Sequence, residues 1–64
     1  MTINGYDISV KEVDLDVNIH VGVILNGKII KAISLKGTIE DTNALLLDTQ
    51  SELYKKIENM IGEI

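Results

Sequence analysis

His20 is the residue of this chain best suited to acid–base or metal chemistry, and it is the only histidine among 64 residues. Three polar residues precede it at alternate positions and would share its face of a β-strand: Asp14, Asp16 and Asn18. Such a set could bind a metal ion or hold a general base. A protein metal site usually has more His or Cys ligands, and the chain has no Cys. We therefore interpret His20 as a solvent-exposed strand residue and predict no metal and no cofactor.

The spacing of Asp14, Asp16 and Asn18 also copies the start of a calcium-binding loop. That loop needs a glycine for its sharp turn and a bidentate glutamate at its end. This chain has Ile19 and Leu25 at those positions. The match therefore fails at both of the positions that define the loop.

A Ser–His–acid triad is the remaining catalytic arrangement, with Ser9, Ser34 and Ser51 as the available nucleophiles. In the hairpin predicted below, Ser34 would lie only diagonally from His20, and no segment supplies an oxyanion hole. A monomer of this length also has little room for a concave site of several hundred Å³. The glycines form no phosphate-binding loop. We predict that the protein is not an enzyme.

The composition predicts one small domain, residues 1–64, with an aliphatic core. Apolar residues make up 45% of the chain, which is far above the disordered range, yet Phe, Trp and Cys are absent. No disulfide can therefore staple a chain of a length at which a single core is marginal. We expect the chain either to self-associate or to pack very well.

Charge and hydropathy disfavour two further classes of protein. Ten acidic residues against six lysines give a net charge of −4, and there is no Arg, the residue best suited to bind phosphate or guanine. No apolar run reaches the length of about 18 residues that a membrane span needs, and Met1 is not followed by a signal sequence. We predict a soluble, cytoplasmic protein that binds neither nucleic acid nor membranes.

Strict alternation of apolar and polar residues from Val13 to Leu25 predicts a strand with one buried face. Asn26-Gly27 is a strong hairpin signal, and residues 28–36 have the pattern of a returning strand. The sequence therefore predicts a long β-hairpin at 13–36.

Two registers of this hairpin compete, and the side chains favour one of them. A two-residue turn at Asn26-Gly27 would pair Asn18 with Leu35, which mixes polar and apolar residues on both faces. A three-residue loop from Leu25 to Gly27 keeps each face uniform apart from Lys31. Its apolar face pairs Val23 with Ile29, Val21 with Lys31, Ile19 with Ile33 and Val17 with Leu35. Its polar face pairs Asp16 with Lys36, Asn18 with Ser34, His20 with Ala32 and Gly22 with Ile30.

The segment before the hairpin predicts a further short strand or hairpin. Asn4-Gly5 repeats the turn signal, and the residues from Tyr6 to Val10 alternate. The alternation changes phase before Val13, which indicates a bulge or a bend at Lys11-Glu12. We therefore predict a three- or four-stranded antiparallel β-meander.

The C-terminal part of the chain has the period of an amphipathic helix, which we predict over about 39–62. Thr38 suits the N-cap of this helix. A second cap at Thr49 leaves an alternative, in which a short strand at 44–47 precedes a helix at 50–62. We favour one long helix, because the leucines of this segment have low β-propensity and lie on the apolar stripe.

Together these elements predict an α+β fold in which the helix lies along the odd-numbered face of the sheet. The long strand and the helix would both measure roughly 36–40 Å, from rises of about 3.3 and 1.5 Å per residue. The molecule would be elongated and thin. Four apolar residues would remain uncovered: Ile24, Ile30, Leu45 and Tyr54. A symmetric homodimer would cover them.

The acidic residues of the C-terminal segment form the strongest candidate binding surface. Together with one aromatic neighbour they are Glu40, Asp41, Asp48, Glu52, Tyr54 and Glu58. This surface could imitate a row of phosphates and block a basic partner, although an ordinary solvated helix face has the same composition.

For the function, we predict a non-enzymatic interaction protein that is homodimeric and regulates or inhibits another protein. Its binding surface would be the acidic face or the leftover apolar residues. One alternative is a structural subunit that adds its edge strand to a neighbour. Another is a small enzyme or ligand carrier with a site at a subunit interface.

Overall fold

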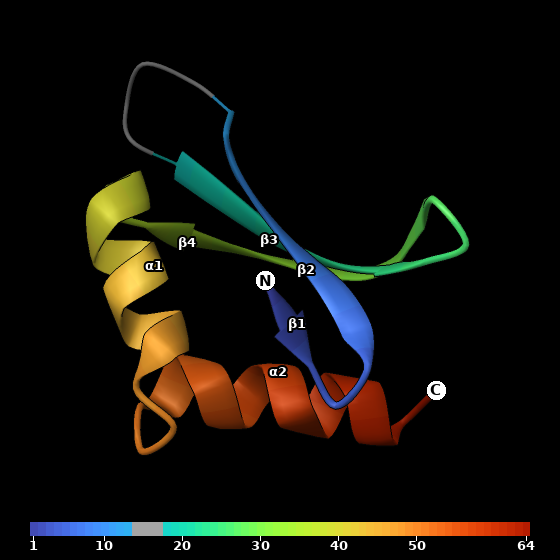
Figure 1. The fold of residues 1–64 in the computed structure, drawn as a ribbon. Coiled ribbons are helices and arrows are strands. Elements are labelled where there is room, and N and C mark those ends of the chain that lie inside the picture. Colours follow the sequence, from blue (N-terminus) through green and yellow to red (C-terminus); the bar gives the residue numbers. More distant parts are fainter. Residues whose placement is uncertain (14–17) are drawn as a thin grey trace.

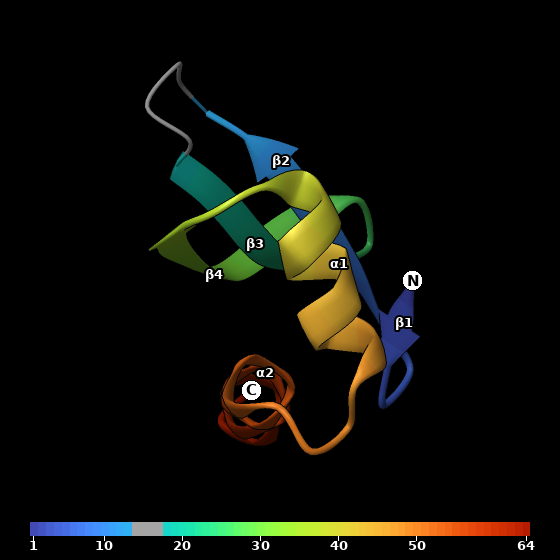
Figure 2. The ribbon, with the colours of Figure 1, turned by 90° about the vertical axis from the view of Figure 1, so that its left-hand side faces the viewer.

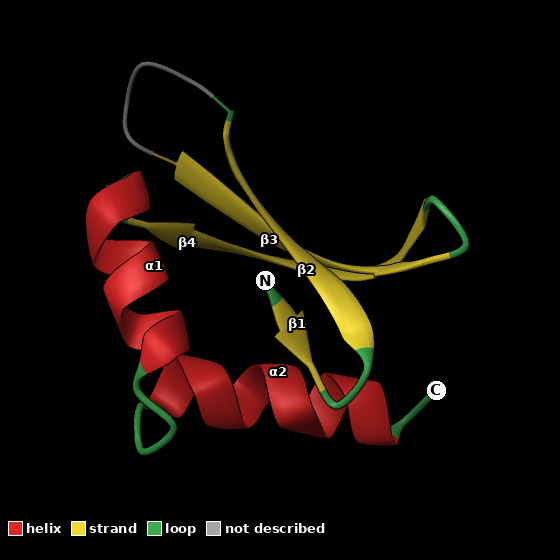
Figure 3. Ribbon diagram, in the orientation of Figure 1, coloured by secondary structure: helices red, strands yellow, loops and turns green. Residues whose placement is uncertain are grey.

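Residues 1–13 and 18–64, which the computed structural model describes, form one antiparallel sheet with two helices on one of its faces (Figure 1, Figure 3). The elements in chain order are β1 (Thr2–Ile3), β2 (Tyr6–Glu12), β3 (Asn18–Leu25), β4 (Lys28–Lys36), α1 (Ile39–Leu47) and α2 (Glu52–Gly62). The strands lie in the order β1-β2-β3-β4, so each strand pairs with its neighbour in sequence. The predicted α+β meander is confirmed in its four-stranded form.

Both tight turns of the sheet are Asn-Gly pairs in the left-handed region. The φ angles are 52° at Asn4, 85° at Gly5, 54° at Asn26 and 77° at Gly27. Positive φ at both central residues is the mark of a type I′ turn, whose twist matches that of a two-residue hairpin. Ile3 accordingly pairs with Tyr6, and Leu25 pairs with Lys28.

The register of the β3–β4 hairpin differs from the predicted one by two residues. The pairs along the apolar face are Val23 with Lys31, Val21 with Ile33 and Ile19 with Leu35. On the polar face Asn18 lies opposite Lys36, His20 opposite Ser34 and Gly22 opposite Ala32.

A β-bulge beside the two-residue turn explains this register. Ile24 pairs with Ile29 and the next pair begins at Lys31, so Ile30 is an extra residue in β4. The extra residue brings the apolar residues of β4 onto the apolar face of β3 without a three-residue loop. The predicted faces are therefore correct for β3 and for β4 from Lys31 onward, whereas the predicted loop, the predicted pairs and the predicted inward face of Ile29 are wrong.

β3 begins at Asn18, later than the predicted start at Val13. Val13 instead donates its backbone N–H to the Asn18 carbonyl at 2.9 Å. β2 pairs regularly with β3 up to its last residue, Glu12, so the change of apolar phase marks the end of β2 and not a bulge. The pairs predicted for Asp16 and Val17 lie outside the described residues.

The C-terminal segment forms two helices in place of the single helix predicted over 39–62. α1 begins after Thr38, whose hydroxyl accepts the Asp41 N–H at 3.0 Å, as the capping pattern predicts. The segment 44–47 is helical and not a strand, and the helix stops at a turn formed by residues 48–51. The two helices meet there at a corner (Figure 1, Figure 2). The molecule measures 30 × 26 × 17 Å, so it is not elongated as predicted.

The core lies between the helices and the inner, odd-numbered face of β3. Its buried apolar side chains are all aliphatic, as the composition predicts, and are Ile3, Ile8, Ile19, Val21, Val23, Leu46, Leu53, Ile57 and Ile61. Lys31, which the sequence places among the apolar residues of β4, is half-buried. Its Nζ donates to the carboxylate of Glu63, just beyond α2, at 2.9 Å.

Candidate functional site

β4 is the outermost strand of the sheet, and its inner face is only partly covered. No other described strand pairs with β4 on the side away from β3, so alternate N–H and C=O groups of β4 point outward. On β3, Ile19 and Val21 are fully buried. Their partners on β4, Leu35 and Ile33, are only half-buried. The helices therefore leave a depression beside the edge of the sheet.

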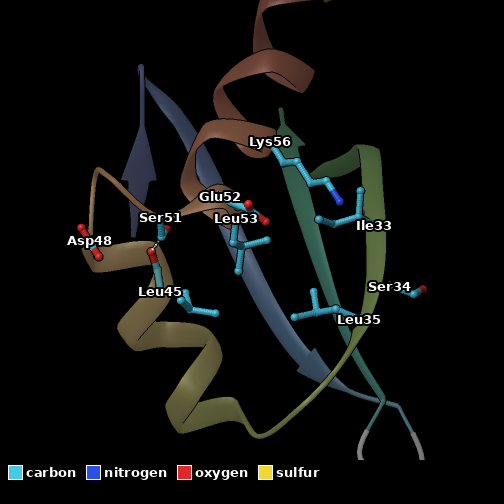
Figure 4. A pocket seen from close by; sticks show the side chains of 9 residues that line it. All are labelled: Ile33, Ser34, Leu35, Leu45, Asp48, Ser51, Glu52, Leu53 and Lys56. Carbon is cyan, nitrogen blue, oxygen red and sulfur yellow. Dashed lines mark hydrogen bonds between the residues drawn. The ribbon is translucent and has the colours of Figure 1, made fainter.

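This depression is an open groove of about 730 Å³ between β4 and the corner of the two helices (Figure 4). Four aliphatic side chains point into it from the three elements: Ile33 and Leu35 of β4, Leu45 of α1 and Leu53 of α2. Five polar residues complete its lining: Ser34, Asp48, Ser51, Glu52 and Lys56. The prediction that this chain has little room for a concave site is therefore wrong, because two short helices that meet at a corner leave a space beside the edge strand.

Hydrogen bonds at residues 48–51 hold the corner that shapes this groove. The buried Ser51 hydroxyl accepts the Tyr54 N–H at 3.1 Å, which caps α2, and donates to the Leu45 carbonyl in the last turn of α1. The Asp48 carboxylate accepts the Gln50 N–H at 3.0 Å. The Ser51 N–H donates to the Asp48 carbonyl at 3.0 Å. Asp and Ser favour such local backbone contacts over helix continuation, which is why the helix ends here.

The edge strand beside the groove is basic. β4 contains Lys28, Lys31 and Lys36 and no Asp or Glu. The hydrogen bond from Lys31, together with its charge, holds the pKa of the Glu63 carboxyl below its ordinary value of 4.5. Among the described residues, no carboxylate lies within ion-pair distance of Lys28 or Lys36. A strand that paired with β4 would therefore meet positive charge that this part of the chain does not neutralise.

The predicted acidic surface is divided between the two helices. Asp48 and Glu52 both line the groove, although the Asp48 carboxylate points away from it (Figure 4). The other four residues lie elsewhere: Glu40 and Asp41 in the first turn of α1, Tyr54 against the core and Glu58 half-buried on α2. Because the helix breaks at residues 48–51, these acidic side chains do not follow one straight helix face.

His20 is exposed on the outer face of β3. Its direct cross-strand neighbours are Lys11 on β2 and Ser34 on β4. Ser34 thus lies directly opposite His20 and not diagonally from it, because the register differs from the predicted one. Within residues 1–13 and 18–64, no group of three or more His, Cys, Asp or Glu side chains could hold a metal ion. Asp14 and Asp16 lie outside this range.

Sequence reasoning did not identify the groove as a site. The alternation assigns Ile33 and Leu35 to the apolar face of the hairpin, and the helix period leaves Leu45 at an uncovered edge. Neither pattern reveals that these residues lie around one groove. The one feature of the sequence that indicates an edge strand beside the groove is the set of lysines in β4, since lysine is common on edge strands.

Protein-family models, curated proteins and solved structures give no match to this chain. None of the helices in the described part of the chain has both the length and the apolar character needed to cross a bilayer. The function is therefore inferred from the groove and from the edge strand beside it.

Proposed function

We propose that this chain is a non-enzymatic interaction protein that binds an extended segment of another protein along β4 and thereby regulates or inhibits that protein. The observation that carries the proposal is the open apolar groove beside the free edge of β4. A segment that adds to the edge as a further strand gains backbone hydrogen bonds, while pockets for its alternate side chains provide specificity.

The groove suits the alternate side chains of such a segment. Ile33 and Leu35 project from β4 at every second residue, which is also the spacing of side chains on one face of an added strand. Leu45 and Leu53 lie across the groove from them (Figure 4). Apolar side chains of the partner would thus be removed from water between aliphatic walls, and this burial is the main source of binding energy.

The opposite edge of the sheet is less suited to strand addition. β1 has 2 residues, whereas β4 has 9. A very short edge strand offers few backbone groups for pairing, which is one way in which proteins protect an edge. Ile3 of β1 is also already buried in the core.

Selection from a random peptide library against the immobilised protein tests this proposal. We expect the enriched peptides to carry apolar residues at alternate positions. In NMR titrations they should shift the amide signals of Ile33, Ser34 and Leu35 more than those of the rest of the chain.

A matched pair of variants serves as the control for this selection. Leu45→Asp should abolish peptide binding, because it places a carboxylate in the groove. Leu47→Asp should leave binding intact, since Leu47 is 75% exposed and does not line the groove. Peptides that bind both variants equally, or that shift the signals of another surface, would contradict the proposal.

Self-association is a second candidate, favoured by apolar residues that are exposed away from the groove. Three of them lie around the β3–β4 turn: Leu25, Ile29 and Ile30. Ile29 is 64% exposed. A dimer that covers these residues would make the chain a homodimeric regulator or a structural subunit. Light scattering across a dilution series at low and high salt measures the oligomeric state. A dimer that is dissociated by Ile29→Ser would support self-association through this surface. A monomer at every concentration would contradict it.

A further inference from the structure

We infer that the segment which binds along β4 is an extended strand whose residues alternate between apolar and acidic. This inference rests on the proposed function, because it names the chemistry of the partner at the same groove. It is drawn from the two faces of β4, which an added strand would continue.

The inner face requires apolar side chains. In a strand paired with β4, every second side chain would lie beside Ile33 and Leu35, with Leu45 and Leu53 across the groove. A charged side chain in that position would lose its hydration without gaining a partner among these aliphatic walls. The inner positions of the partner are therefore apolar.

The outer face favours carboxylates. The alternate side chains of the added strand would lie beside Ala32, Ser34 and Lys36, all of which are exposed. Opposite charges at neighbouring cross-strand positions attract, and like charges repel. Lys36 has no described carboxylate within ion-pair distance, and Lys28 adds a second such charge at the turn end of β4. Acidic residues at the outer positions of the partner would lie beside Lys36 and neutralise it, whereas Lys28, which pairs with Leu25, lies on the other face of β4.

The helix side of the groove does not reverse this preference. Glu52 and Lys56 on α2 carry opposite charges and line the same wall. The Asp48 carboxylate accepts the Gln50 N–H and points away from the groove (Figure 4). The lysines of β4 therefore set the sign of the charge along the edge.

The same lysines disfavour a second copy of the chain as the occupant of this edge. If two β4 strands paired with each other, each would bring three lysines and no carboxylate to the new ladder. Lysine on an edge strand is a common device against self-pairing. A specific interface often combines attraction for one partner with repulsion of another, and here the same residues would provide both.

Isothermal titration calorimetry with three synthetic peptides of equal length tests the inference. Each peptide alternates Val with a second residue, which is Glu, Thr or Lys. At low salt we expect the Val/Glu peptide to bind about tenfold more tightly than the Val/Lys peptide, with the Val/Thr peptide between them. The difference should shrink as salt is added, because exposed charges are screened.

Two charge-reversal variants locate the effect. Lys36→Glu should remove the preference for the Val/Glu peptide. Lys55→Glu changes the net charge of the protein equally but lies on α2 outside the groove lining, so it should preserve the preference.

The possible outcomes separate the inference from the proposed function. Equal binding of all three peptides would overturn the acidic partner and leave strand addition at the groove intact. Failure of every peptide to bind would overturn both. β4 amide signals that shift with protein concentration alone would identify a second copy as the occupant and overturn the acidic partner.

Discussion

β3 and β4 are paired strands of one hairpin, yet the same face of the sheet is closed over β3 and open over β4. Ile19 is fully buried, while Leu35 directly opposite it is half-buried. Val21 and Ile33 repeat this contrast at the next inward-facing pair. Both strands are rich in aliphatic residues, so residue type does not explain the difference.

The position of the helices explains it. Buried residues of α1 and α2 pack with those of β2 and β3, whereas the inner residues of β4 lie at the margin of this cluster. Burial on one face of a sheet therefore depends on which strands the second layer covers. An edge strand that the second layer does not cover keeps both its backbone groups and its apolar side chains available to a partner.

The largest expected effect compares Ile19→Ala with Leu35→Ala, two truncations at directly opposed positions. Ile19→Ala opens a cavity in the closed core and should lower the free energy of unfolding by about 2–5 kcal/mol. Leu35→Ala should lower it by roughly 1 kcal/mol, because a half-buried side chain removes less apolar surface from water. Urea unfolding followed by circular dichroism measures both values.

Ile19→Val keeps this comparison accessible if Ile19→Ala does not fold, with an expected loss of about 0.5–1.5 kcal/mol. Equal losses from the alanine substitutions at the two positions would mean that β4 is packed as deeply as β3. The contrast between the closed and the open strand would then be lost.

Two single-residue deletions in β4 come next in expected size. Removal of Ser34 forces either Ile33 or Leu35 onto the outer face and should lower the free energy of unfolding by about 1.5–3 kcal/mol. Removal of Ile30 takes out the bulge but leaves every pair beyond it in place, so its cost should be smaller. Denaturant unfolding of both variants measures the difference. An Ile30 deletion that is the more harmful of the two would contradict the observed register.

Ser51→Ala should lower the free energy of unfolding by a smaller amount, about 1–2 kcal/mol, because it removes the cap of α2 and the hydrogen bond to the Leu45 carbonyl. The same change should weaken peptide binding, since this residue links the two helices around the groove. Thr49→Ala is the matched control, because Thr49 is exposed and lies outside the groove lining. Thermal unfolding and peptide titration of both variants check this prediction, and equal effects would count against it.

Glu63→Gln should have the smallest effect, because it removes an exposed ion pair at the rim of β4. Lys31 lowers the pKa of Glu63 in the folded protein, so the pair stabilises the fold at pH values above 4.5. This contribution is lost as the pH falls through the lowered pKa. The melting temperature of the wild-type protein should therefore exceed that of Glu63→Gln at neutral pH and converge with it in acid. A difference that persists in acid would assign the effect to another cause.

Much of the fold was predictable from local patterns. The alternation in β3 and β4, the Asn-Gly turns and the Thr38 cap each depend on neighbouring residues, and each led to the correct type of element. The single long helix was wrong because the apolar residues after the four polar residues 48–51 continue the helical period of those before them. In the structure, however, the side chains of Asp48 and Ser51 bind backbone groups there.

The candidate site was less predictable than the fold. The acidic residues of the C-terminal segment were chosen from composition, and of these only Asp48 and Glu52 line the groove. The aliphatic lining residues come from β4, α1 and α2. Their meeting depends on the sheet order, on the bulge at Ile30 and on the corner at Ser51.

The sequence by itself determined the antiparallel meander, the faces of β3 and of β4 from Lys31 onward, the aliphatic core and the helical C-terminal segment. These features follow from periods of two and about 3.6 residues and from turn residues with positive φ, all of which act over short distances along the chain. Only the tertiary structure decided the hairpin register, the break between the helices and the open groove at β4. The break is made by local hydrogen bonds of Asp48 and Ser51, which the helical period of the apolar residues does not reveal. The groove depends on contacts between residues far apart in sequence, because it lies where the two short helices stop covering the apolar face of the sheet.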